Sequence, residues 1–126
     1  MGEFLSELVV TCKSDDKWLL VRNFVFKSDM CIAPIVVPAG FETDFASVPR
    51  LPLAYLLAGD TAHEAAVIHD YLYRTGKADR KTADEIFLEA MKAQGIPAWR
   101  RRLMYWAVRT FGGSSYKGEN NGPDEL

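Results

Sequence analysis

The sequence predicts an α+β domain, in which a small, mostly antiparallel β-sheet from the N-terminal half packs against three C-terminal α-helices. Two observations predict this class. β-Branched and aromatic residues separated by polar breaks dominate the first third of the chain, as is typical of strands. Three segments with helical spacing of apolar residues follow. We expect a single globular domain over residues 1–116 and a flexible polar tail over residues 117–126, because the tail consists almost entirely of polar residues, glycine and proline.

In the N-terminal half, we expect strands at residues 8–12, 18–21 and 24–26. Residues 35–37 and 41–43 flank the segment Pro38-Ala39-Gly40. This arrangement predicts a hairpin whose turn is set by proline and glycine. The following segment contains two further prolines, so we expect a shaped loop there rather than a helix or a central strand.

We expect the helices at about residues 62–74, 80–93 and 97–111. Thr61 and Glu64 fit a capping box at the start of the first helix. Asp79 is a natural N-cap for the second helix, which Gly95 should end. Pro97 suits the first turn of the third helix.

The charge balance bears on the class of partner. Fifteen basic and seventeen acidic residues give a net charge of −2, which argues against a general nucleic-acid or anionic-membrane binder. No apolar stretch approaches the roughly 20 residues of a membrane span. We therefore expect neither nucleic-acid binding nor membrane insertion.

The most informative stretch is the apolar run at residues 65–73, which carries His69 and Asp70 side by side in its middle. His69 lies in line with the apolar stripe of its helix and should face inward. Asp84 lies in line with the apolar residues of the second helix and should face inward as well. His63 falls in the first turn of its helix, where we expect it to be exposed.

Asp44 stands where the predicted hairpin gives way to the loop. With the inward-facing residues it predicts a cluster of Asp44, His69, Asp70 and Asp84, with Arg80 or Arg50 as counter-charge. One interpretation is a buried network that docks the helices on the sheet, with Asp70 paired to an arginine and His69 bonded to a backbone carbonyl. The other is an acid–base or divalent-metal site, since imidazole and carboxylates can bind a metal and activate water.

Other reactive arrangements are less well supported. Ser47 has no glycine elbow around it, so a capping or turn role fits better than a Ser-His-Asp triad. We predict no cofactor and no bound metal. If a metal were bound, its ligands would be His69, Asp70 and Asp44.

The third helix carries Trp99 and Trp106, seven residues apart. This spacing indicates core packing or a docking surface rather than a platform for stacking bases. The helix opens with Arg100-Arg101-Arg102, which forms either a solvated face or a contact for an anionic partner.

Four ordered motifs, at residues 37–50, 65–73, 80–87 and 104–109, resemble a family of phage and prophage proteins catalogued as domain of unknown function 1353. The resemblance covers roughly residues 34–116. The residues that match the family's recurrent polar positions are Asp44, Ser47, Pro49, His69, Asp70, Tyr73, Arg80 and Asp84. The resemblance implies a phage-encoded protein whose gene lies among tail and lysis functions. It also implies synthesis in the cytoplasm of the bacterial host, association with the virion, and other phage structural proteins as partners.

Two hypotheses of function follow. In the first, the chain is a small hydrolase of a phage tail or lysis module that acts on the host cell envelope. His69, Asp70, Asp44 and Asp84 would then form the catalytic site, supported by Ser47, Tyr73 and Arg80. In the second, which we favour, it is a non-catalytic virion or tail-assembly component, in which the same cluster is a buried polar network.

Overall fold

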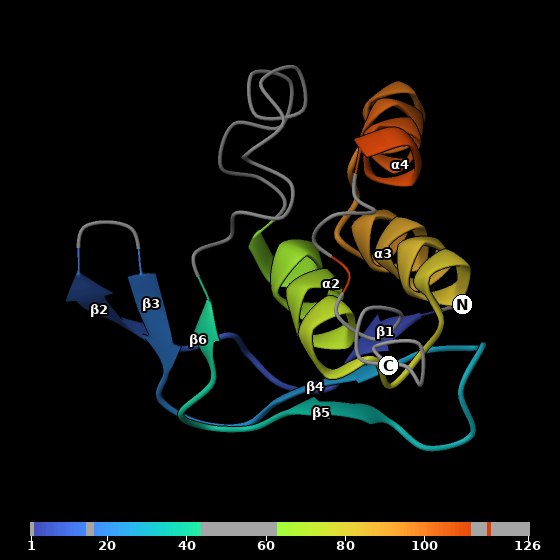
Figure 1. The fold of residues 1–126 in the computed structure, drawn as a ribbon. Coiled ribbons are helices and arrows are strands. Elements are labelled where there is room, and N and C mark those ends of the chain that lie inside the picture. The colour runs from blue at the N-terminus through green and yellow to red at the C-terminus, as the bar shows by residue number, and fades with distance from the viewer. Residues whose placement is uncertain (1, 15–16, 44–62, 112–115, 117–126) are drawn as a thin grey trace, which may run out of the picture.

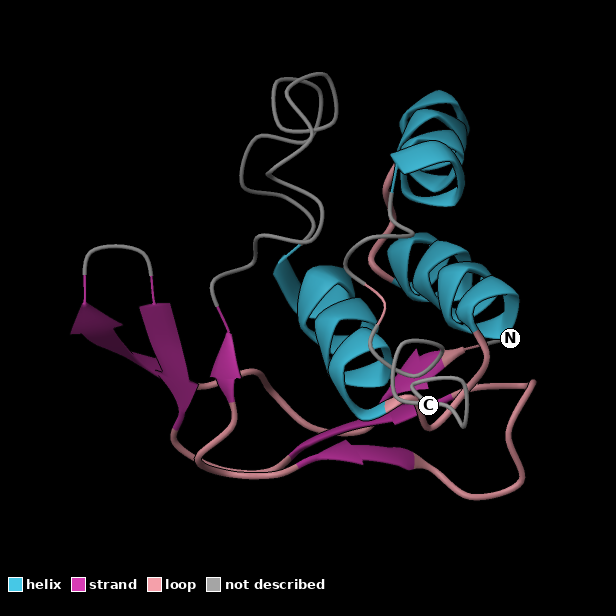
Figure 2. Ribbon diagram, viewed as in Figure 1, coloured by secondary structure: helices cyan, strands magenta, loops and turns pink. Residues whose placement is uncertain are grey.

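The computed structural model describes residues 2–14, 17–43, 63–111 and 116, and its α+β class agrees with the sequence prediction. Figures 1 and 2 show the strands on one side and the helices on the other. The strands are β1 (Glu3–Phe4), β2 (Val10–Ser14), β3 (Lys17–Leu20), β4 (Phe24–Lys27), β5 (Ile35–Val37) and β6 (Glu42–Thr43). The helices are α2 (His63–Thr75), α3 (Arg80–Ala93) and α4 (Ala98–Phe111).

The described strands form two three-stranded antiparallel sheets, where the sequence had suggested one. Their orders are β1–β4–β5 and β2–β3–β6. The predicted hairpin between residues 35–37 and 41–43 is wrong, because β5 pairs with β4 and β6 pairs with β3.

A different and longer hairpin takes its place. Trp18 lies opposite Thr43 in one sheet, and Phe24 lies opposite Val37 in the other, in the same register. The backbone amide of Leu20 continues this ladder by donating to Phe41 O at 3.0 Å. Residues 18–26 and 35–43 therefore form one bent antiparallel ladder that runs through both sheets, and the chain reverses at residues 28–34.

The segment Pro38-Ala39-Gly40 forms a turn, in which the amide of Phe41 donates to Pro38 O at 3.1 Å, and this turn bends the ladder instead of ending it. Gly40 has a φ of 90°, a backbone conformation that side chains other than glycine rarely adopt. Its amide donates to Leu20 O at 2.8 Å. The amide of Ala39 donates to the side chain of Asn23, which lies between β3 and β4, also at 2.8 Å. The predicted turn is therefore present, but it redirects two paired strands and does not join β5 and β6 in a hairpin.

The true reversal of the hairpin is fixed to α3. Ser28 is buried, and its hydroxyl donates to Glu89 Oε1 at 2.6 Å. The amide of Asp29 donates to Glu89 Oε2 at 2.9 Å. One carboxylate of α3 therefore holds the chain where it leaves β4.

Helices α2 and α3 lie over the β1–β4–β5 sheet, and α4 packs on α3 farther from the sheet (Figure 1). The core between these layers contains Phe24, Phe26, Ile68, Ile86, Phe87, Met91 and Met104, all buried. Apolar residues at helical spacing on α2 and α3 fill it, as their periodicity predicts.

The helix boundaries agree with most of the predicted signals. Asp79 caps α3, since its side chain accepts from Thr82 N at 3.3 Å. Gly95, at a φ of 81°, follows the end of that helix. Thr61 of the predicted capping box lies outside the described residues. Within the described ranges, none of the helices is long and apolar enough to cross a bilayer.

Candidate functional site

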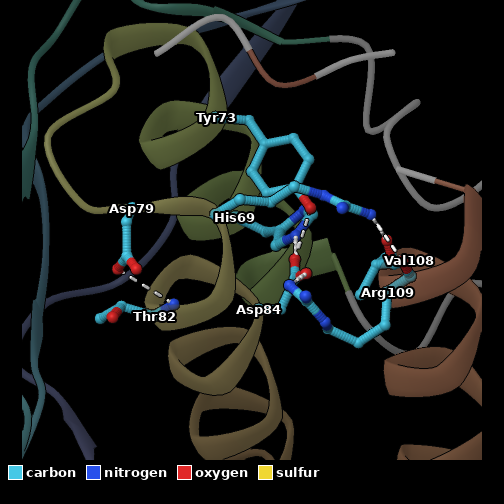
Figure 3. Close-up of polar contacts among 8 residues, drawn as sticks. His69, Tyr73, Asp79, Thr82, Asp84, Val108 and Arg109 are labelled. Carbon is cyan, nitrogen blue, oxygen red and sulfur yellow. Dashed lines mark hydrogen bonds and ion pairs between the residues drawn. The ribbon is translucent and has the colours of Figure 1, made fainter. Parts of the chain in front are cut away.

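Three helices meet at the carboxylate of Asp84, which belongs to α3 and is 0% exposed. Its Oδ1 lies 2.7 Å from His69 Nε2 and accepts the hydroxyl hydrogen bond of Tyr73 at 2.6 Å. Its Oδ2 accepts a hydrogen bond from Arg109 Nη1 at 2.8 Å. Figure 3 shows these side chains converging on Asp84 from α2 and α4. We call these four residues the Asp84 network.

The local sequence explains why His69 and Tyr73 reach the same acceptor. They lie four residues apart on α2, so both project from the same face. Their ring centroids are 4.1 Å apart, and the ring of Phe87 lies 4.6 Å from that of His69 on the α3 side. The polar atoms are therefore enclosed by aromatic carbon, where hydrogen bonds are less weakened by water.

The electrostatics of the Asp84 network favour an ionised carboxylate. Burial raises the pKa of Asp84, but the hydrogen bonds from His69, Tyr73 and Arg109 lower it more, so the pKa lies below its ordinary value. Burial, with the hydrogen bond to Asp84, raises the pKa of the Tyr73 hydroxyl far above its usual range. The hydrogen bond to Asp84 raises the pKa of Arg109. At neutral pH the network thus consists of one buried carboxylate and its donors.

The second ring nitrogen of His69, Nδ1, takes no part in the Asp84 network. Because Nε2 faces a carboxylate oxygen, Nε2 carries a proton. Nδ1 is buried and has no hydrogen-bond partner in the described part of the chain. In a neutral imidazole, Nδ1 therefore holds the basic lone pair.

The counter-charge of Asp84 is Arg109, which the sequence analysis did not nominate. The prediction was Arg80 or Arg50. Arg50 lies outside the described residues, and the ion pair of Asp84 in the described part of the chain is with Arg109. The Nη2 of Arg80 donates instead to the carbonyl oxygens of Val108 at 2.9 Å and Arg109 at 2.6 Å. Arg80 thereby satisfies carbonyl groups of the last turn of α4, which lack partners within that helix.

Asp70 belongs to a second contact. Its Oδ2 accepts from the hydroxyl of Thr43 on β6 at 2.9 Å, and its Oδ1 lies 3.1 Å from Arg74 Nε. Arg74 Nη1 also donates to Glu42 O at 2.7 Å. The predicted pairing of Asp70 with an arginine is therefore confirmed, and Asp70 joins α2 to the β2–β3–β6 sheet.

The structure brings together only part of the predicted cluster. His69 and Asp84 are in direct contact, whereas the bonds of Asp70 run to β6 and Arg74. His69 contacts a carboxylate rather than the backbone carbonyl expected for a docking network. His63 is exposed, as predicted. The other members, Asp44, Ser47, Pro49 and Arg50, lie outside the described residues.

The side chains that could bind a metal do not gather into one cluster in the part of the chain that the structure describes. Among the described residues, no group of three or more histidine, cysteine, aspartate and glutamate side chains converges as a metal site would require. Of the three conditional ligands, Asp44 is outside the described residues. His69 and Asp70 bond to different elements, His69 to Asp84 of α3 and Asp70 to Thr43 of β6.

A family model described as "Protein of unknown function (DUF1353)" matches residues 18–108. The chain belongs to the DUF1353 family. The match confirms the resemblance to domain of unknown function 1353. It covers His69, Tyr73 and Asp84 of the Asp84 network, and Arg109 follows its last residue.

This DUF1353 chain is also similar to the uncharacterized protein y4jT of Sinorhizobium fredii (strain NBRC 101917 / NGR234). The two are 37% identical over 79 residues, which make up 60% of this chain and 23% of that protein. The DUF1353 chain therefore corresponds to a minor part of the longer relative. No solved structure matches it.

Proposed function

We propose that this chain is a non-catalytic structural or assembly component of a phage or prophage tail module. One observation carries the non-catalytic part: both oxygens of the fully buried Asp84 carboxylate are bonded to donors from within the chain. A carboxylate that works as a base or ligand needs an oxygen directed at the substrate or metal. Asp84 instead ties α2 and α4 to α3, so its role is to hold the helices in one arrangement.

The phage origin rests on the resemblance of the ordered motifs at residues 37–50 and 65–73 to phage and prophage proteins. On this proposal the chain is made in the cytoplasm of the bacterial host and then joins the virion. Its partners are other phage structural proteins, and α4 supplies the docking face. The Asp84 network keeps that helix fixed on the rest of the domain.

Particle composition tests this proposal. Particles would be purified from the phage or induced lysogen that carries the gene, with the chain epitope-tagged. We expect the tagged chain in the particles at a constant ratio to the tail proteins, and tail-defective particles after deletion of the gene. Asp84→Asn should lower incorporation in parallel with thermal stability. Asp79→Asn, the same change at the exposed cap of α3, should leave both unchanged. A chain that stays wholly in the lysate supernatant would refute the proposal.

A second candidate function is a small envelope hydrolase, and the geometry of His69 favours it. Its Nε2 is held by Asp84 while Nδ1 remains unbonded within the described ranges. An aspartate that orients a histidine in this way supports general-base catalysis in many hydrolases. His69 is buried, so access to Nδ1 is the condition that this candidate must meet.

A matched substitution separates the two candidates. In His69→Gln, the amide nitrogen can still donate to Asp84, but the basic lone pair is gone. The readout is the release of soluble fragments from purified peptidoglycan by the wild-type chain and the variant. If the wild type releases fragments and His69→Gln does not, although both have the same melting temperature, the chain is a hydrolase. Equal and negligible release by both supports the assembly component.

A further inference from the structure

The outward side of α4 exposes two large aromatic side chains. Trp99 is 53% exposed and Trp106 is 51% exposed. They lie seven residues apart, so they sit two turns apart on one side of the helix. Arg102, between them in sequence, is exposed as well. We call Trp99, Arg102 and Trp106 the α4 face.

All charged residues of α4 are positively charged. The helix sequence contains four arginines and no acidic residue, although the whole chain has a net charge of −2. Two of the arginines are committed inside the fold: Arg101 donates to Ile96 O at 2.7 Å, and Arg109 donates to Asp84. The guanidinium of Arg100 lies 5.4 Å from the ring centroid of Trp99. Positive charge and aromatic surface are therefore combined on the exposed side of the helix.

Hydrogen bonds from side chains fix both ends of α4, the helix that carries the α4 face. Arg101 ties the first turn of α4 to the preceding loop. Arg80 and Asp84 of α3 hold its last turn. A surface fixed in this way loses less conformational entropy on binding than a mobile one.

A groove of about 800 Å³ between α3 and α4 adjoins the α4 face. Met30, Leu88 and Tyr105 contribute its apolar lining, and Arg102 belongs to both the groove and the α4 face. Asp29, Glu85 and Glu89 also line it. Lys92 and Arg101 line it as well, and this mixed charge is unlike the positive surface that a nucleic-acid backbone requires. The groove therefore suits the apolar side chains of a protein segment whose carboxylates lie outside it, beside Arg100 and Arg102.

We propose that the α4 face docks an acidic segment of another protein, with apolar side chains between the two tryptophans and carboxylates beside Arg100 and Arg102. This inference rests on the proposed function and names the chemistry of its partner. Tryptophan and arginine are the residues that most often dominate binding energy at interfaces. A second copy of α4 fits less well, because α4 has no acidic residue to meet Arg102 of the first copy.

The test uses two designed helical peptides labelled with fluorescein. Both carry leucine at positions i, i+4 and i+7. One has glutamate at the flanking positions, and the other has lysine there. Fluorescence anisotropy measures binding to the full chain. We expect the glutamate peptide to bind on the order of tenfold more tightly than the lysine peptide, with an advantage that falls as salt rises.

Substitutions on the face make the test specific. Trp99→Ala and Trp106→Ala should each weaken binding of the glutamate peptide on the order of tenfold. Arg102→Glu should reduce or reverse the preference between the peptides. The matched control is Val21→Ala, an apolar residue that is 52% exposed at the end of β3, away from α4. It should leave binding unchanged. Circular dichroism checks that each variant is folded.

Several results would overturn the inference. They are equal binding of the two peptides, no effect of the tryptophan substitutions, and tighter binding of a single-stranded oligonucleotide than of the glutamate peptide. A dimer in sedimentation that Trp106→Ala dissociates would assign the face to a second copy instead. If Trp106→Ala blocks incorporation into particles while the peptides bind equally, this partner chemistry fails and the assembly function stands. If the chain is absent from particles, the assembly function fails regardless of the peptides.

Discussion

Burial of the Asp84 carboxylate removes hydration worth several kcal/mol, and only a full set of donors can replace it. His69, Tyr73 and Arg109 supply that set at distances between 2.6 and 2.8 Å. Hydrogen bonds to a charged acceptor are shorter and stronger than neutral ones. Asp84 is therefore tolerated in the core because these three donors replace the lost hydration of its carboxylate. In return, the carboxylate holds the three donors in place.

Replacing Asp84 should reveal this dependence. Asp84→Asn removes the negative charge and places an amide group against at least one donor. We expect a loss of about 2–3 kcal/mol in the free energy of unfolding, as for hydrogen bonds to buried charged groups. Asp79→Asn makes the same change on α3 but keeps an N-cap residue, so it should change stability by less than about 0.5 kcal/mol. Urea unfolding of both variants measures the difference, and equal losses would contradict the assigned role.

The pH dependence follows from the pKa of Asp84. Its pKa in the folded chain is below the ordinary value of 3.8. A carboxyl group with a lowered folded-state pKa contributes stability that is complete above the unfolded value and is lost as the pH falls through the folded value. The stability gap between wild type and Asp84→Asn should therefore stay constant from neutral pH down to about pH 5 and shrink below about pH 4. Because the wild type and Asp84→Asn share all other carboxyl groups, the titration of those groups cancels in the difference between the two stabilities. A gap that persists at pH 3 would contradict the prediction.

At the residue scale, helical phase was sufficient to place His69 and Asp84 in contact, since both lie on the apolar stripes of their helices. The predicted cluster grouped Asp70 with them, whereas the structure directs Asp70 to Thr43 of β6 and to Arg74. Neighbouring residues on a helix point about 100° apart, so one faces α3 and the other faces β6. Arg109 was missed because a cation in the last turn of a helix already has a local explanation in the helix dipole. Its partner on another helix depends on the packing angle, which no local pattern encodes.

At the scale of the element, α4 is the helix with the fewest contacts to the sheets, and arginines secure both of its ends. Arg80→Ala should free the carbonyl groups of Val108 and Arg109. We expect a loss of about 1–2 kcal/mol and faster amide hydrogen exchange in the last turn of α4, while α2 keeps its protection. Lys81→Ala, at an exposed position next to Arg80, is the control and should change neither. Uniformly faster exchange in all three helices would indicate global destabilisation instead.

The strands show where local signals end. Pro38 and Gly40 were predicted to form a turn, and the turn is present. The assumption that such a segment reverses the chain was wrong, because the same chemistry also bends a ladder that continues. The distinction depends on which strands pair, and the pairing of β3 with β6 and β4 with β5 joins residues up to 25 apart in sequence. The α3 boundaries, by contrast, were predicted to the residue, since capping is a local interaction.

At the scale of the whole molecule, the helical layer is joined to each sheet in a different way. The β1–β4–β5 sheet meets α2 and α3 through buried apolar side chains. The β2–β3–β6 sheet also places Leu20 in this core, and it adds the polar contacts that Asp70 and Arg74 make with β6. Polar contacts of this kind have strict geometry, whereas apolar packing tolerates small shifts. The polar residues of α2 therefore add geometric precision to the contact between the helices and the second sheet.

The end of the domain provides the last prediction, because the boundary at residue 116 has so far been inferred from composition alone. Tyr116 is buried, its hydroxyl donates to Ala78 O at 2.7 Å, and its ring packs edge to face on Tyr73 at 5.2 Å. It therefore supports the aromatic residue that donates to Asp84. A chain shortened to residues 1–116 should retain the unfolding free energy of the full chain within about 0.5 kcal/mol. Tyr116→Ala in that shortened chain should cost about 3–5 kcal/mol, as for other buried aromatic side chains. Chemical unfolding of the three proteins decides the point. A large loss on removing residues 117–126 alone would move the boundary of the domain beyond Tyr116.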